Sequence, residues 1–279
     1  MAKKADLDAF RVPFVTDAKK ADPFSLAHFD PAAKPFSAGS KQADQKCLTA
    51  IGTQLNDLQE RLHTQRQQRV LLVLQGMDTS GKDGVIRAVL REVDPLGLRI
   101  ISFKAPTLIE QAHDFLWRVH QHTPAAGELT VFNRSHYEDV LVPRVLQQID
   151  QAEVERRYRH IRDFEALLST TGATIIKCFL HISKAEQRRR LQARIDDPSK
   201  NWKFESADLD ARKLWEPYQT AYRDALEATS TKYAPWYVIP ADSKAHRNVM
   251  VAQLLLRALQ RLRLQYPPAK MSLEGIKIT

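Results

Sequence analysis

Glycine and cysteine are both scarce in this chain, which has nine glycines and two cysteines among 279 residues. Cys47 and Cys178 lie far apart and match no metal-binding or redox spacing, which argues against a centre built on cysteine. No apolar run has the length of a bilayer span, and the N-terminal segment lacks the apolar core of a signal peptide. We therefore expect a protein of the reducing cytoplasm.

Negative charge is in deficit, because 42 lysines and arginines stand against 33 aspartates and glutamates. The resulting formal net charge of +9 attracts anions such as nucleic acid, acidic membranes, nucleotides and inorganic polyanions. Charge alone does not choose among these partners. A hydrophobic content of 43% is ordinary for a folded domain with a sizeable core.

Apolar segments typical of strands alternate with longer segments typical of helices. Strands are expected at residues 70–74, 99–103, 129–132, 174–182 and 236–239. Helices are expected at residues 81–93, 107–120, 135–149, 152–169, 184–195, 208–229 and 245–264. The first strand is apolar throughout, as expected when helices cover both faces of a sheet. The alternation predicts an α/β fold with a five-stranded parallel sheet.

Three regions are expected along the chain. Residues 1–40 form an N-terminal arm laid over the surface, with a partly disordered tail as the alternative. The expected anchors of the arm are Phe10, Phe14, Phe24, Phe29 and Phe36. Residues 41–265 form the main domain, with a lid at about residues 184–207, and residues 266–279 form a C-terminal tail.

A helix at residues 41–68 opens the main domain. Its leucines and isoleucine recur at helical steps, at Leu48, Ile51, Leu55, Leu58 and Leu62. We expect this stripe to pack on the main domain, and a subunit interface is the alternative.

A phosphate-binding loop follows the first strand. The segment GMDTSGK has the G-x-x-x-x-G-K spacing of a Walker A motif, in which backbone N–H groups and a lysine surround phosphate oxygens. Lys82 is the expected mobile cation, and we expect Gly84 to allow close packing of the following helix on the strand. The remaining residues expected to contact phosphate are Gly76, Met77, Thr79, Ser80, Gly81 and Asp83.

Two acidic residues make this loop unusual. Asp83 occupies the position where the motif ordinarily has a serine or threonine for Mg²⁺, so the metal must be held differently. Asp78 lies inside an anion-binding loop, where a carboxylate repels phosphate unless a metal or a transferred proton compensates. We expect Asp78 to organise the metal, and a turn or capping aspartate is the alternative.

The third strand ends in a polar segment that is expected beside the loop. Asn133 stands where P-loop kinases usually have a carboxylate for Mg²⁺, while Glu138 and Asp139 lie one turn further on and could supply that charge. Arg134 is expected to face phosphate, and a capping role is the alternative for Asn133. His136 is taken as a structural hydrogen-bonding group.

A basic segment follows the fourth strand. Arg190 and Arg194 share one face of a helix that Asp197-Pro198 ends, which is typical of a lid that brings cations to a transferred phosphoryl group. The alternative is a basic helix face that is merely solvated. This alternative has more weight for Arg189 and Arg190 than for Arg188 and Arg194. Further candidate phosphate contacts are Arg188 and Lys104.

Five segments in this order resemble the type-2 polyphosphate kinase family: GMDTSGKDG, SFKAP, FNRSHYEDVLVPRV, RIDDPSKNWKF and YAPWYVIPADSKAHRN. The resemblance covers residues 71–258, roughly two thirds of the chain. It implies a P-loop kinase fold, a three-layer α/β/α sandwich with a helical lid similar to thymidylate kinase. It also implies reversible transfer of phosphate between inorganic polyphosphate and adenine nucleotides with Mg²⁺. Mn²⁺ as the metal and guanine nucleotides as substrates are left open. The resemblance further implies an oligomer, either a dimer or a tetramer.

The resemblance also assigns roles to individual residues. The implied catalytic residues are Asp78, Lys82, Arg134 and Arg194, and the implied metal ligands are Asp78, Asn133 and Glu138. Many members have Asp in place of Asn133 and Asn in place of Glu138, and FNRSHYE resembles the subgroup that phosphorylates both AMP and ADP. We therefore expect Asn133 and Glu138 to set acceptor choice during in-line transfer without a covalent intermediate.

Two other functions fit parts of the sequence. An ordinary ATP-dependent nucleoside or nucleotide kinase shares the loop and fold, but Asp78 and Asp83 argue against it. A non-enzymatic basic P-loop protein that binds nucleic acid fits the charge, but no nucleic-acid-binding module or basic–aromatic pattern is present.

Overall fold

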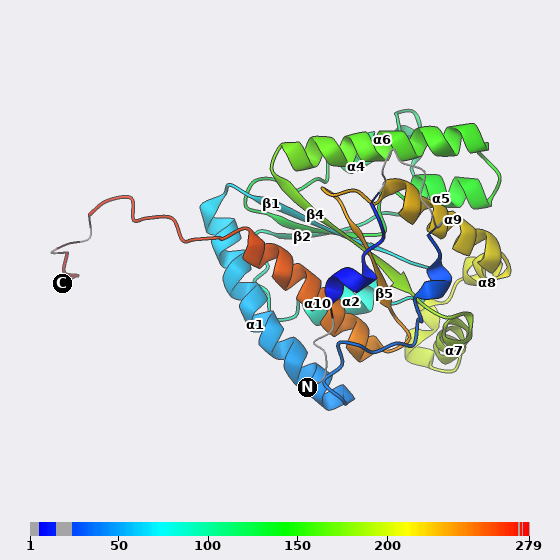
Figure 1. The fold of residues 1–279 in the computed structure, drawn as a ribbon, viewed down its shortest axis with the longest axis horizontal. Helices are drawn as coiled ribbons and strands as arrows, with labels where there is room; N and C mark the ends of the chain where they lie inside the picture. The colour runs from blue at the N-terminus through cyan, green and yellow to red at the C-terminus, as the bar shows by residue number, and fades with distance from the viewer. Residues whose placement is uncertain (1–5, 15–23, 273, 275, 279) are drawn as a thin grey trace.

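The computed structural model describes residues 6–14, 24–272, 274 and 276–278 of the chain. Their five strands form one parallel sheet in the order β2-β3-β1-β4-β5 (Figure 1). The strands are β1 Arg69–Gln75, β2 Leu98–Ser102, β3 Leu129–Asn133, β4 Ala173–His181 and β5 Trp236–Pro240. Leu72 of β1 is in register with Val131 of β3 and Ile176 of β4. The predicted α/β fold with a five-stranded parallel sheet is confirmed.

Helices cover both faces of the sheet, which makes three layers (Figure 1). One face packs on α1 Lys41–Gln65, α2 Lys82–Val89 and α10 Lys244–Arg261. The other packs on α5 Glu138–Val145, α6 Gln151–Thr170 and α9 Trp215–Thr229. None of the helices in the described ranges combines the length and apolar character that crossing a membrane requires.

Helix α1 lies along α10 on the outside of this sandwich (Figure 1). The helix begins at Lys41, because the Ser40 side chain accepts a hydrogen bond from the N–H of Ala43. The buried members of its apolar stripe are Leu48, Ile51, Leu55 and Leu62. The expected packing of the stripe on the main domain is confirmed, and these four side chains are covered within the chain.

Two predicted helices are each divided into two in the structure. Residues 107–120 form α3 Leu108–Gln111 and α4 Trp117–His120, because the Asp114 carboxylate accepts from the N–H groups of Leu116 and Trp117 and starts a new turn. Residues 208–229 form α8 Ser206–Lys213 and α9, because Pro217 has no N–H to donate to Lys213.

Four other predicted helices are shorter than expected, and two of them differ mainly at their C-terminal ends, since α1 ends at Gln65 instead of residue 68 and α10 at Arg261 instead of residue 264. The segment 81–93 is helical only in α2 and ends at Val89, and the segment 135–149 is helical only in α5, which ends at Val145. The lid region contains α7 Lys184–Ile195 followed by the 3-10 helix η3 Pro198–Lys203.

The N-terminal arm is tied to the far edge of the sheet. The N–H of Val12 donates to the Trp236 carbonyl of β5 at 2.9 Å. The ring of Phe10 lies 6.2 Å from that of Phe29 and 6.0 Å from that of Phe36. The arm also contains the short 3-10 helices η1 Leu7–Phe10 and η2 Leu26–His28, whereas residues 1–5 and 15–23 of the expected arm lie outside the described residues. After α10, the described tail extends away from the domain (Figure 1).

Candidate active site

The loop between β1 and α2 needs glycine at two positions. Gly81 has a φ of +100°, and a Cβ added there would lie 2.0 Å from Nη1 of Arg247. A Cβ on Gly76, at a φ of +153°, would lie 2.8 Å from the Leu180 carbonyl. A Cβ added to Gly84 would lie 3.1 Å from Nη2 of Arg247. This glycine therefore allows close packing of α2 against α10, and not against the strand as expected.

Two buried arginines hold the carbonyl groups of this loop. Nη1 of Arg190 donates to Thr79 and Ser80 at 2.9 and 3.1 Å, and Nη1 of Arg247 donates to Ser80 at 2.9 Å. In the described part of the chain, the N–H groups of Thr79 and Gly81 have no acceptor. They are therefore available to phosphate oxygens, which is what the Walker A spacing predicts.

Arg190 and Arg247 differ from what the sequence suggested. Arg190 is buried and also donates to the carbonyls of Ala241 and Asp242, so it belongs neither to a solvated face nor to a mobile lid. Arg247 was missed. The available signal was a lone arginine at the start of an otherwise apolar face of the last helix.

Lys82 begins α2 and points back into the loop. Its Nζ donates to the Gly76 carbonyl at 2.7 Å, and the side chain is buried. Burial lowers the pKa of Lys82, and the positive charge of Arg134 lowers it further. A phosphate anion at the loop would favour the charged lysine again, because opposite charge raises the pKa of an amine.

Asp78 and Arg134 meet across the loop. Arg134 follows β3 with a φ of +63°, and its Nη2 donates to Oδ1 of Asp78 at 3.0 Å. Although burial opposes its charge, the carboxylates of Glu138 and Asp78 raise the pKa of Arg134 above its ordinary value. The expected phosphate-binding arginine thus lies beside the loop carboxylate.

Two amides hold two further carboxylates of the site. Nδ2 of Asn133 donates to Oδ1 of Asp83 at 2.8 Å, so Asn133 joins β3 to the first turn of α2 and does not cap a helix. Nε2 of Gln75 donates to Oε1 of Glu138 at 3.0 Å from a fully buried position. Gln75 was missed, and its signal was a polar residue at the end of an apolar strand.

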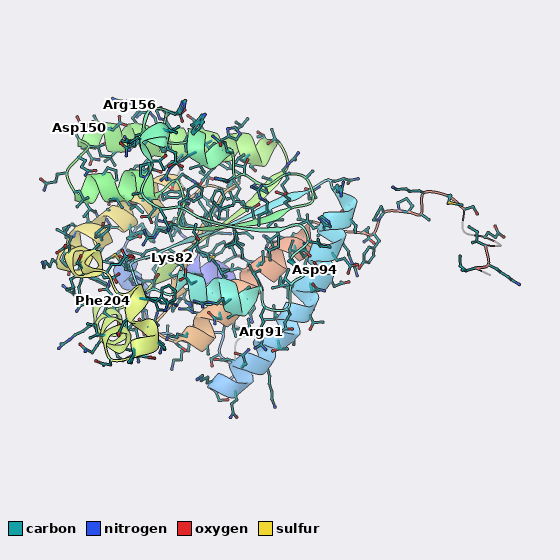
Figure 2. The ribbon with its side chains drawn as sticks, turned by 180° about the vertical axis from the view of Figure 1, so that it is seen from behind. Lys82, Arg91, Asp94, Asp150, Arg156 and Phe204 are labelled. Carbon is teal, nitrogen blue, oxygen red and sulfur yellow. The ribbon has the colours of Figure 1, made fainter. Side chains whose placement is uncertain are left out.

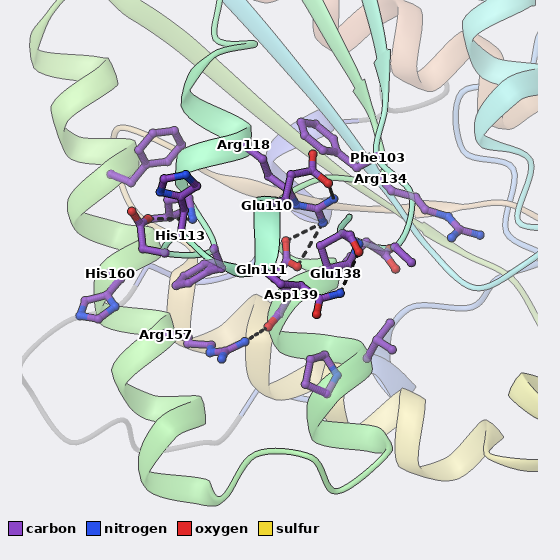
Figure 3. A pocket seen from close by; sticks show the side chains of 18 of the residues that line it. Phe103, Glu110, Gln111, His113, Arg118, Arg134, Glu138, Asp139, Arg157 and His160 are labelled. Carbon is purple, nitrogen blue, oxygen red and sulfur yellow. Dashed lines mark hydrogen bonds and ion pairs between the residues drawn. The ribbon is translucent and has the colours of Figure 1, made fainter. Parts of the chain in front are cut away.

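Asp139 does not contribute to the loop. Its carboxylate accepts two hydrogen bonds from Nη2 of Arg118, at 2.9 and 3.1 Å, in a buried ion pair (Figure 3). The expectation that Asp139 supplies charge to the metal is therefore wrong, because a buried guanidinium already occupies its oxygens.

A strongly cationic cavity of about 800 Å³ opens over the loop. Eleven lysines and arginines and three carboxylates line it, and Figure 2 shows Lys82 on the side of the molecule that carries the lid. The predicted residues that line it are Asp78, Thr79, Gly81, Lys82, Asp83, Gly84, Lys104, Asn133, Arg134 and Arg194. Such a lining suits a multiply charged anion.

The lid contributes a different set of arginines than expected. Arg194 lines the cationic cavity, while its Nη1 donates to the Lys203 carbonyl at 2.9 Å and to Asp208 at 3.1 Å. Arg188 is exposed and does not line the cavity, whereas its neighbour Arg189 does. The structure therefore does not bring Arg188 to the other predicted residues.

A second, larger cavity of about 1370 Å³ (Figure 3) shares several lining residues with the first. Its walls come from α5, α6 and the segment that carries α3 and α4, and they include the aromatic rings of Phe103 and Phe115. Lys104 and Arg134 line both cavities, so cations stand where the two spaces meet. The walls combine aromatic rings and four lysines and arginines with six carboxylates, so a ligand with an aromatic ring can lie against the rings and direct its phosphate toward Lys104 and Arg134.

A third cavity, of about 80 Å³, adjoins the loop and has two carboxylates in its lining. Asp78 and Glu138 both line it, together with Arg134 and two tyrosines of α9, Tyr218 and Tyr222. Within the described residues, no three acidic, histidine or cysteine side chains form a preformed metal cluster. Two carboxylates with room for water and phosphate oxygens fit a small hard cation such as Mg²⁺, which takes few protein ligands.

Comparisons with known proteins point to one family. The family model described as Polyphosphate kinase 2 (PPK2) matches residues 38–267. The chain is 51% identical over 255 residues to an AMP/ADP-polyphosphate phosphotransferase of Meiothermus ruber, covering 91% of this chain and 96% of that protein. It is 43% identical over 265 residues to an ADP-polyphosphate phosphotransferase of Rhodopseudomonas palustris, covering 91% and 90%.

A solved structure gives the same answer for the fold. The crystal structure of polyphosphate kinase 2 from Arthrobacter aurescens TC1 superposes with a TM-score of 0.90 at 46% sequence identity. The match covers 95% of this chain and 93% of the crystallised one. The P-loop kinase fold expected from the sequence is confirmed.

Proposed function

The chain belongs to the polyphosphate kinase 2 family, and from this membership we propose that it transfers phosphate from inorganic polyphosphate to both AMP and ADP. Relatives with these names make it a polyphosphate-dependent nucleotide kinase rather than an ordinary ATP-dependent kinase. The same finding sets aside the non-enzymatic nucleic-acid-binding alternative.

One structural observation supports this function most strongly. Arg134 lines all three cavities, so a single guanidinium faces the cationic space, the aromatic space and the small acidic space at once. We assign polyphosphate to the cationic cavity and the nucleotide to the larger one. Arg134 then stands between donor and acceptor phosphates, where charge is spread during transfer.

The proposed reaction is an in-line displacement. An oxygen of the nucleotide's terminal phosphate forms a bond to the end phosphorus of the chain, and the bond from that phosphorus to the next bridging oxygen breaks. The shortened chain leaves with the electron pair. Lys82, Arg134 and Arg194 balance the charge, and the N–H groups of the loop hold the donor phosphates. The acceptor phosphate is already largely ionised near neutral pH, so little help from a general base is needed.

A divalent metal fits the acidic side of this site, and we propose Mg²⁺ held by Asp78 and Glu138. When bound, the ion would neutralise part of the negative charge that develops on the phosphates during transfer. The amide nitrogen of Asn133 donates to the Asp83 carboxylate, so only the amide oxygen of Asn133 is available as a metal ligand. Mn²⁺ is the alternative that a metal series would test.

The experiment that tests the function is ATP formation by purified protein given Mg²⁺, polyphosphate and either AMP or ADP. ATP from both acceptors, lost in Lys82→Ala and retained in Lys46→Ala, supports the proposal. Lys46 is an exposed lysine of α1 that lines none of the cavities described here. ATP from ADP alone would refute the dual-acceptor part. No ATP from either, with ATP accepted as donor, would refute polyphosphate as the donor.

Three further properties follow from the resemblance. We propose a homo-oligomer of two or four chains, and exposed Leu108 and Ile109 are apolar side chains that such a contact would cover. Light scattering of Leu108→Ser against the parent chain tests this.

A cytoplasmic location, where AMP and ADP are present, is tested by cell fractionation. Use of guanine nucleotides is tested by replacing AMP with GMP in the same assay.

A further inference from the structure

A fourth cavity, of about 360 Å³, lies beside the cationic cavity and has no role in the reaction described above. It is formed where the N-terminal arm meets the starts of α1 and α10. Arg189 and Lys244 line both this cavity and the cationic one. The two spaces are therefore neighbours that share a cationic wall.

Three lysines of the fourth cavity have no counter-ion. Lys34 of the arm, Lys41 of α1 and Lys244 of α10 all line it. No carboxylate of the described residues lies within 4.0 Å of their ammonium groups, whereas the neighbouring Arg189 is paired with Glu186 at 2.5 Å. Loss of hydration and the charges of Arg190 and Arg247 lower the pKa of Lys244, as expected for cations gathered without an anion.

The two carboxylates of this cavity are already hydrogen-bonded to the protein. Asp44 is buried and accepts from Ser37 Oγ at 3.0 Å and from the Ala38 N–H at 2.6 Å. Asp242 accepts from the Ser183 N–H at 2.8 Å. Both carboxylates have protein donors of their own, so the three lysines face the space without a fixed partner.

We propose that this cavity is a distal subsite for the polyphosphate chain, reached over Arg189 and Lys244 from the phosphate-binding loop. The inference rests on the proposed function, since it takes the same donor. Lysines suit such a chain because an ammonium group is a mobile point charge that demands no fixed ligand geometry. The consequence is a preference for chains long enough to reach Lys34 and Lys41, while a short donor occupies only the loop.

The test compares donors of different length in the double variant Lys34→Ala/Lys41→Ala. Both residues lie outside the residues that line the cationic cavity, so transfer at the loop is retained. For long chains we expect KM to rise about three- to tenfold with kcat unchanged, because each exposed ion contact is worth little by itself. For tripolyphosphate we expect no change. Lys46→Ala removes one positive charge from the same helix and is the matched control.

Direct binding separates this inference from the proposed function. Isothermal titration of long-chain polyphosphate into the protein without nucleotide should show weaker binding by the double variant and a shallower dependence on salt. Equal affinity and equal salt dependence in the two proteins would overturn the subsite even if the enzyme makes ATP. If the parent protein binds long chains through Lys34 and Lys41 but makes no ATP, the subsite stands and the proposed function fails.

Discussion

Nη2 of Arg134 lies 3.0 Å from Oδ1 of Asp78, and this contact joins the end of β3 to the phosphate-binding loop. The arginine here balances the loop carboxylate, which would otherwise repel phosphate. In the reaction that we propose, the guanidinium would turn to the donor and acceptor phosphates, and the Asp78 carboxylate would then be free to hold a cation. The ion pair therefore holds together, before substrates bind, the two charged groups that have separate partners during the proposed reaction.

Replacing Asp78 tests its role as organiser of the metal. Asp78→Asn keeps the shape and removes the charge, and we expect kcat to fall about 10²- to 10³-fold, the usual size of one lost electrostatic contact. Raising Mg²⁺ should recover part of the rate in steady-state ATP formation, because a weakened metal site fills at higher concentration. Asp57→Asn, at the exposed ion pair with Arg61, is the control and should keep full activity. A variant that keeps more than half the parent rate contradicts the role.

Acceptor choice tests Glu138 together with Gln75, which holds it. Glu138→Asn should depress kcat/KM for AMP more than for ADP, because the shorter nucleotide needs the second carboxylate to hold metal. Gln75→Leu removes one hydrogen bond to that carboxylate and should shift the ratio the same way by up to about tenfold. The double variant should be no more selective than Glu138→Asn. Equal loss with both acceptors would disprove the idea, and Gln45→Leu on the exposed side of α1 is the control.

The sequence was sufficient for the parts of the site that are local in the chain. A glycine pattern between a buried strand and a helix locates the loop, and Lys82 follows it by spacing alone. Alternation of strand and helix gives the sheet, since parallel strands need helical crossovers. His136 was expected to be a structural group, and it lies buried against Glu165.

The parts that were missed are contacts between distant segments. Arg247 reaches the loop carbonyl of Ser80 across 167 residues, and its place at the start of an apolar helix face does not say which distant segment it contacts. Arg188 and Arg190 lie two positions apart on α7, yet Arg190 is buried under the loop and Arg188 is exposed. Which of the lid arginines faces phosphate depends on how α7 docks, which periodicity does not fix.

A buried ionic cluster beneath the Arg134 turn should dominate the stability of the site. Nζ of Lys177 donates to Glu165 at 2.6 Å and to Tyr137 Oη at 2.8 Å, and burial lowers the pKa of Lys177 to about 8. Lys177→Met removes the cation paired with the buried Glu165 carboxylate and leaves it only the contacts of His136 and Tyr137, which should lower the free energy of unfolding by about 3–5 kcal/mol in urea titrations.

The matched tests for this cluster are a second substitution and a surface pair. Adding Glu165→Gln to Lys177→Met removes the stranded charge and should recover part of the stability. Lys213→Met, at an exposed ion pair with Asp210, should cost less than about 1 kcal/mol. If Lys177→Met and Lys213→Met lower the free energy of unfolding equally, the buried cluster stabilises the protein no more than an exposed ion pair does.

His181 at the end of β4 should make the protein sensitive to mild acid. Burial lowers the pKa of His181 to about 4 from an ordinary value of 6.5, and its Nδ1 has no hydrogen-bond partner in the described structure. Between pH 6.5 and 4 the unfolded chain binds a proton that the folded protein does not, so stability falls as pH falls through this window. Between pH 7.5 and 5.0 the loss from this group is about 2 kcal/mol.

The measurement is urea unfolding at pH 7.5 and 5.0 for the parent chain, His181→Gln and His28→Gln. His181→Gln has no titrating group at this position, so its stability should fall by about 2 kcal/mol less over the same interval. His28 is exposed on the N-terminal arm, and its replacement should leave the pH dependence unchanged. A pH dependence that is the same in all three proteins would mean that His181 accepts its proton in the folded state as easily as in the unfolded chain. In that case the burial of its ring at the end of β4 would carry no electrostatic cost.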